Sequence, residues 1–147
     1  MDSRRAAPSL GIVSSLAVVA VLAVPYLLVE NGGAVGVYYG TGLLTPWASG
    51  LLALVAVIIF AAGREGRTDP VTAASIGFGF GVVIFIAALV WAATVDVNVA
   101  LQLTTDDPIL GPLTTGIVLE YHRWLFSLVS FFTAVAGGWY ARTLGLL

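Results

Sequence analysis

The sequence contains no cysteine, and this absence excludes disulfide bonds, thiolate metal sites and thiol chemistry. Charge is also scarce: charged residues make up 10% of the 147 residues, whereas a soluble domain carries about 25%. Hydrophobic residues account for 59% of the chain. Because a water-soluble surface cannot be built from so few charges, the composition predicts a protein that lies in a membrane.

Four long apolar stretches fill most of the chain, at about residues 10–29, 46–63, 72–95 and 118–141. A helix that crosses about 30 Å of hydrocarbon needs roughly 20 apolar residues. Three of the stretches reach this length, and the second does so only if Leu43 and Leu44 join it. We therefore predict an all-α fold over residues 1–147, consisting of a single integral membrane domain built as a four-helix bundle.

The middles of these stretches lack ionisable residues. No Asp, Glu, Lys, Arg or His lies near the centre of any of them, although ion-coupled carriers, proton relays and voltage sensors usually place such groups there. The chain also lacks the phosphate-binding loop motif and the HExxH and GxSxG motifs. We therefore expect no enzyme activity, no catalytic residue, no cofactor and no nucleic-acid partner.

The basic residues are of one type. All six are arginine, against eight acidic residues, and alanine, glycine and valine are abundant. In this composition and in its pattern of four spans, the whole chain resembles the small, uncharacterised four-span membrane proteins of halophilic archaea. The resemblance rests on no motif, and it implies no activity.

The arginines predict how the chain is oriented in the membrane. The N-terminus, the 63–71 connection and the C-terminus together hold five of the six arginines, with three acidic residues. The 30–45 and 96–117 connections and the start of the fourth stretch hold the sixth, Arg123, with five acidic residues. Since short connections rich in arginine stay in the cytoplasm, we expect a multi-pass protein of the cell membrane with both termini cytoplasmic.

Both connections on the predicted outer side show a weak period of two. Alternation of this kind places the apolar residues on one face of a strand. Two interpretations stay open: the segments pair as strands above the bundle, or they lie in the headgroup region of the membrane. The alternating apolar residues are Val35, Val37 and Tyr39 in the first connection and Val97, Val99, Leu101 and Leu103 in the second.

Small residues recur every four positions on the third and fourth stretches. They predict where helices approach closely, because lipid gives helices no hydrophobic reason to associate. Packing within one bundle, homo-oligomerisation and a permeation path are all open interpretations of these faces. In the first stretch, Pro25 removes one backbone hydrogen bond and predicts a kink near the outer end. The small residues that we predict at helix contacts are Gly77, Gly81, Ser130, Ala134 and Gly138.

Reactive side chains gather at the start of the fourth stretch, in the consecutive residues Glu120, Tyr121, His122 and Arg123. His122 is the single histidine, and histidine titrates near neutral pH. Glu120 can pair with Arg123, because residues three apart are neighbours on a helix surface. These residues are the candidate functional cluster of the chain.

Two hypotheses fit this cluster. The first is a ligand- or proton-responsive site in which Asp96, Asp106 or Asp107 supplies a second carboxylate. The second is an interfacial ion pair beside a solvated histidine. A metal centre is not expected, because one histidine with scattered acidic residues falls short of the three protein ligands of a catalytic zinc site.

The function that we predict is that of a non-catalytic scaffold or accessory subunit, which acts by helix–helix contact within the lipid bilayer. Its partner would be another membrane protein or a second copy of itself. One alternative is a small transporter or channel subunit that requires oligomerisation to build a pathway. Another is an outward-facing sensor or binding module that uses the acidic residues of the outer connections.

Overall fold

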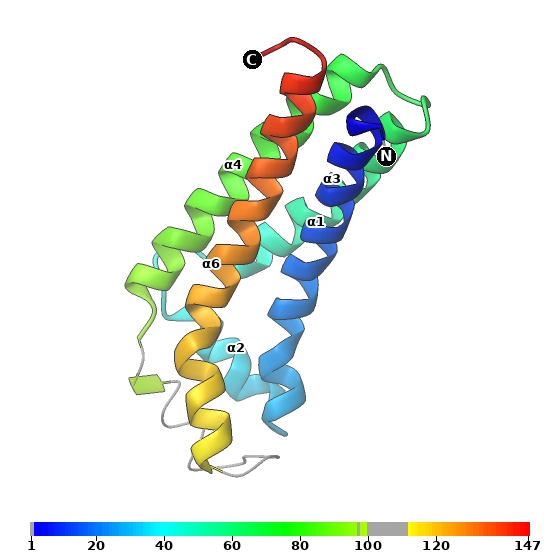
Figure 1. Ribbon diagram of the computed structural model, residues 1–147. Helices are drawn as coiled ribbons and strands as arrows, with labels where there is room; N and C mark the ends of the chain where they lie inside the picture. The colour runs from blue at the N-terminus through cyan, green and yellow to red at the C-terminus, as the bar shows by residue number, and fades with distance from the viewer. Residues whose placement is uncertain (1, 97, 100–111) are drawn as a thin grey trace.

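The computed structural model describes residues 2–96, 98–99 and 112–147, with side chains from residue 116 in the last segment (Figure 1). Every regular element that it describes is a helix, and four of them are long and apolar enough to cross a membrane. This confirms the predicted all-α character and the four membrane-length helices. The elements are α1 (Ser3–Leu28), α2 (Gly32–Gly40), α3 (Pro46–Arg64), α4 (Pro70–Thr94) and α6 (Pro112–Thr143).

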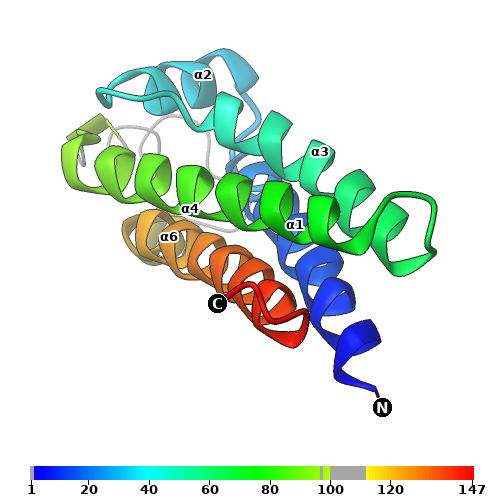
Figure 2. The same cartoon turned by 90° about the horizontal axis from the view of Figure 1, so that it is seen from above.

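The four long helices pack side by side, each antiparallel to its two neighbours (Figures 1 and 2). Helix α1 packs against α3 and α6, and α4 packs against the same two helices from the other side. Both chain termini and the α3–α4 connection lie at one end, which we call the terminus end (Figure 1). Helix α2 lies at the opposite end, which we call the α2 end.

Capping side chains and prolines determine where the helices begin. The Asp2 carboxylate accepts a hydrogen bond from the Arg4 backbone N–H, and that of Asp69 accepts one from Thr72. Such caps satisfy N–H groups that have no partner within a helix. Helices α3 and α4 both start with a proline, whose fixed φ suits the first helical turn. Between them, Gly66 takes a φ of +72°, which favours glycine.

The predicted strand around Val35 is wrong, because this segment forms helix α2. The Asn31 side chain starts the helix by accepting hydrogen bonds from the backbone N–H groups of Gly33 and Ala34. The helical period then buries Val35, Tyr38 and Tyr39 on one face, so packing decides between the two periods. In the second segment, residues 97 and 100–104 lie outside the described residues.

Helices α4 and α6 touch backbone to backbone. A Cβ atom on Gly81 would lie 2.7 Å from the Ala134 Cα, and one on Gly137 would lie 2.5 Å from the Phe78 Cα. Only glycine allows this approach, and it is the close packing that small residues permit between membrane helices. Gly137 was not predicted from the sequence to lie at a helix contact, because the four-residue spacing selected its neighbour Gly138.

The other predicted small residues also lie at helix contacts. A Cβ on Gly77 would meet the Phe60 ring at 2.6 Å, and one on Gly138 would meet the Phe78 ring at 3.3 Å. Ser130 is fully buried and donates a hydrogen bond to the Phe126 carbonyl.

The interior is filled at two levels. Towards the terminus end, the fully buried Phe60 ring of α3 lies between Gly11 of α1 and Gly77 of α4. Towards the α2 end, buried aromatic side chains from several helices meet in one cluster. This second level contains the single histidine of the chain.

Candidate functional site

The site begins with Pro25 of α1. In an α-helix each carbonyl accepts a hydrogen bond from the N–H four residues later, and proline has no N–H. The carbonyl of Val21 therefore has no partner within its own helix. His122 of α6 supplies one, because its Nε2 lies 2.8 Å from the Val21 oxygen. A carbonyl can only accept, so Nε2 carries the proton and donates it.

This hydrogen bond also sets the role of the second ring nitrogen. In a neutral imidazole whose proton is on Nε2, Nδ1 is an acceptor. The Tyr38 hydroxyl of α2 lies 3.3 Å from Nδ1 and donates to it. His122 and Tyr38 are each only 1% exposed, so the hypothesis of a solvated histidine is wrong. Because the helical period turns residue 122 towards the interior, His122 lies inside although it stands beside charged residues in the sequence.

A second carbonyl beside the proline is bonded in the same way. The hydroxyl of Tyr39, which is fully buried, donates to the Leu22 oxygen over 2.7 Å. Burial raises the pKa of both the Tyr38 and Tyr39 phenols, so the two hydroxyls keep their protons and remain donors. Two adjacent carbonyls of α1 are therefore bonded by side chains of α2 and α6.

Aromatic rings enclose these hydrogen bonds. The Trp91 ring of α4 lies 5.5 Å from Tyr38, 5.6 Å from Tyr39 and 6.1 Å from His122, measured between ring centroids. Trp47 of α3 lies 5.4 Å from Tyr39. Through its two tyrosines, α2 therefore contacts all four long helices and covers the α2 end of the interior. We call Tyr38, Tyr39, Trp91 and His122 the aromatic–histidine cluster.

The other predicted site residues do not join His122. Glu120, Tyr121 and Asp96 are exposed, and Asp106 and Asp107 lie outside the described residues. Four consecutive residues of a helix point in different directions, about 100° apart, which separates Glu120 from His122.

Arg123 is half-buried and contacts α4 rather than Glu120. Its guanidinium donates to the Ala92 carbonyl over 3.3 Å and lies 5.2 Å from the Trp124 ring. Among the described residues, the ion pair that forms joins Arg67 to Glu65 over 3.0 Å. The predicted pairing of Glu120 with Arg123 is therefore not seen.

A protein-family model matches residues 1–145 of the chain. The chain belongs to the DUF7548 family, a family of unknown function. Comparisons with curated proteins and with solved structures gave no match. An unknown-function family fits the resemblance to uncharacterised proteins, while the halophilic archaeal source stays a prediction.

In this DUF7548 chain the hydrogen bonds of the cluster join three helices. Both ring nitrogens of His122 are engaged in hydrogen bonds, which leaves no lone pair for a metal or a substrate. The described residues contain no group of three or more His, Cys, Asp or Glu side chains that could hold a metal ion. The arrangement compensates for a missing backbone donor and fixes α1, α2 and α6 relative to one another.

Sequence reasoning missed Tyr38 and Tyr39, although one signal pointed to them. The strand interpretation placed Tyr38 on the opposite face from Val35 and Tyr39, whereas a helix that starts at Asn31 puts all three on one face. Asn followed by two glycines is a plausible helix start, because asparagine is a preferred N-cap residue. The predicted proline kink also implied a free carbonyl in need of a donor.

Proposed function

We propose that this protein is a non-catalytic scaffold or accessory subunit of the cell membrane, with both termini in the cytoplasm, that binds a transmembrane helix of a partner membrane protein. The observation that carries the proposal is an open apolar groove on the α4–α6 face. The interior of the molecule is filled, so a partner helix would bind on the outer surface, where this groove lies.

The filled interior argues against a pathway within one copy. Phe60 and the aromatic–histidine cluster occupy the space between the four long helices at two levels. Apart from His122 and the buried tyrosines and tryptophan, the buried polar side chains of the described residues are serines and a threonine. Coupled transport normally needs ionisable groups along its route.

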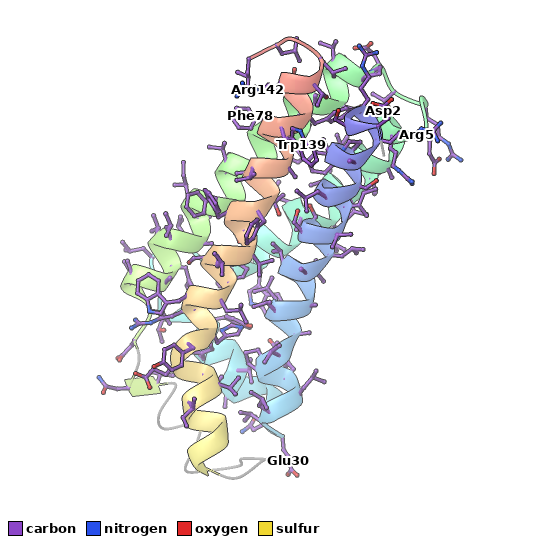
Figure 3. All side chains as sticks on the ribbon, viewed as in Figure 1. Asp2, Arg5, Glu30, Phe78, Trp139 and Arg142 are labelled. Atoms are coloured by element: carbon purple, nitrogen blue, oxygen red, sulfur yellow. The ribbon has the colours of Figure 1, made fainter. Side chains whose placement is uncertain are left out.

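The groove has the shape and chemistry of a helix-binding surface. Its volume is about 800 Å³, and Ala134 and Gly138, four residues apart on α6, contribute to its lining. Both residues also pack against α4 but are only half-buried, so their remaining surface lets a further helix approach closely. The rings of Phe78 and Phe131 add apolar contact area, and Figure 3 labels Phe78, Trp139 and Arg142 on this part of the molecule.

The orientation is supported by where the charges lie. The structure brings both termini and the α3–α4 connection together at the terminus end (Figure 1). Five of the six arginines belong to these segments. Arginine-rich short segments are retained in the cytoplasm, which supports a cytoplasmic terminus end and an α2 end outside.

Photocrosslinking in native membranes tests the helix-binding groove. Val135 lines the groove and is 40% exposed, whereas Val83 of α4 is 51% exposed and does not line it. A photoreactive amino acid at position 135 should give a protein adduct whose cross-linked peptide, identified by mass spectrometry, comes from a transmembrane segment. The same group at position 83 should react with lipid alone. Lipid adducts alone at both positions would contradict the proposal.

A further inference from the structure

Two adjoining cavities open among the arginines at the terminus end. Their volumes are about 270 and 280 Å³, and Arg5 of α1 and Arg64 of α3 line both. Arg4 lines the second cavity as well. Figure 3 shows Asp2 and Arg5 at this end of the molecule.

Two acidic residues also line these cavities, and each makes one contact of its own. Asp2 lines the second cavity, but its carboxylate accepts a hydrogen bond from the Arg4 backbone N–H over 3.2 Å. Glu65 lines the first cavity and pairs with Arg67 over 3.0 Å. Among the described residues, no ion pair neutralises Arg4, Arg5 or Arg64.

Arg4 and Arg5 lie at a helix N-terminus where the N-cap residue, Asp2, supplies one negative charge. Both lie in the first turn of α1, which contains no acidic residue. The N-terminus of a helix carries partial positive charge, so it attracts anions and repels cations. An anion bound between these residues would relieve both the helix end and the arginine side chains.

A buried hydroxyl also lines the second cavity. Tyr140 of α6 is only 2% exposed, and its hydroxyl makes no hydrogen bond to another described residue. A Cβ on Gly63, which lines the same cavity, would lie 3.0 Å from this hydroxyl oxygen. Although the Tyr140 side chain is buried, its hydroxyl reaches the cavity, where an anionic oxygen would accept its proton.

We propose that Arg4, Arg5, Arg64 and the Tyr140 hydroxyl form a binding site for a phosphate group. The site lies at the ends of membrane-length helices, where the phosphates of anionic phospholipids are present at high local concentration. Arginine pairs with phosphate through several N–H donors, and the tyrosine hydroxyl adds one more. A free phosphate offers the same chemistry, so the source must be resolved by experiment. This site does not depend on the helix-binding groove.

Lipid binding to the purified full-length protein tests the site. The protein in neutral detergent is titrated with phosphatidylglycerol, with phosphatidylcholine, or with inorganic phosphate. Native mass spectrometry counts retained lipid, and thermal unfolding reports stabilisation. Retention of phosphatidylglycerol over phosphatidylcholine identifies lipid as the source, and stabilisation by inorganic phosphate alone identifies a free anion. Either result supports the phosphate site if it requires the arginines.

Matched variants test whether binding requires the arginines. The double variant Arg5→Gln with Arg64→Gln should weaken binding about 30-fold, since each arginine contributes roughly one factor of five. Tyr140→Phe keeps the ring and should weaken binding about fivefold. Arg142→Gln removes the same charge from an exposed side chain that lines neither cavity, so it should bind normally. Equal binding by the double variant and Arg142→Gln, or equal retention of the two lipids without a response to phosphate, would overturn the proposal.

Discussion

The hydrogen bond from His122 to the Val21 carbonyl should matter only while residue 25 is a proline. In His122→Leu the Val21 carbonyl and the Tyr38 hydroxyl both lose their partner. A buried polar group left without a partner costs about 1–3 kcal/mol in protein interiors. Interhelical hydrogen bonds in membranes contribute less, about 0.6 kcal/mol on average and about 1.7 at most. We therefore expect His122→Leu to lower the free energy of unfolding by about 1–3 kcal/mol.

The double variant Pro25→Ala with His122→Leu isolates the free energy that the hydrogen bond to the Val21 carbonyl contributes. Pro25→Ala restores a backbone N–H at position 25, which can bond to the Val21 carbonyl within α1. In that background His122→Leu leaves only the Tyr38 hydroxyl without a hydrogen-bond partner. Its cost should therefore fall by about 1 kcal/mol, and this difference is the coupling energy of a double-mutant cycle.

Reversible unfolding in mixed detergent micelles, followed by tryptophan fluorescence, measures the four free energies. The control is Tyr121→Leu, a neighbouring residue of α6 whose side chain is 63% exposed, and it should be neutral within about 0.5 kcal/mol. An equal cost of His122→Leu in the proline and alanine backgrounds would refute the account of the kink.

Three further results are expected. Gly81→Leu should lower the free energy of unfolding by about 3 kcal/mol, because the leucine side chain would overlap the α6 backbone. Val83→Leu, at a 51% exposed position, should be neutral in the same unfolding assay. With no native cysteine as background, an impermeant thiol reagent on intact cells should label Thr105→Cys and spare Thr68→Cys, and the reverse pattern would contradict the proposed orientation. The purified protein in liposomes should show no solute or ion flux, and reproducible flux that a substitution at His122 abolishes would favour the transporter alternative.

The long helices could be predicted from the sequence because membrane burial depends on local hydrophobicity. Their ends could not, because polar signals extend them beyond the apolar residues. Helix α1 starts at Ser3, where Asp2 caps it, although the apolar stretch begins near residue 10. Helix α6 starts at Pro112, ahead of the stretch near 118, since proline suits a first helical turn.

The candidate site was only half predictable. The reactive run at residues 120–123 and the kink at Pro25 were both visible in the sequence, yet the link between them depends on packing. The Val21 carbonyl that receives the His122 proton is 101 residues away in the chain. No local sequence pattern predicts a hydrogen bond between residues so far apart in the chain. The charged neighbours of His122 also suggested that its side chain is exposed. Its burial follows from which face of α6 turns towards α1.

The aromatic–histidine cluster also explains how a poor helix-forming segment comes to be helical. Four of the nine residues of α2 are glycine, which disfavours helix by about 1 kcal/mol each relative to alanine. Its stability must therefore come from tertiary contacts, chiefly those of Tyr38 and Tyr39. Tyr39 bonds to α1, but Tyr38 bonds to His122 of α6, which is synthesised after α1 to α4. Helix α2 can therefore reach its full stability only after α6 has packed against α1, so the α2 end should form as one cooperative unit late in folding.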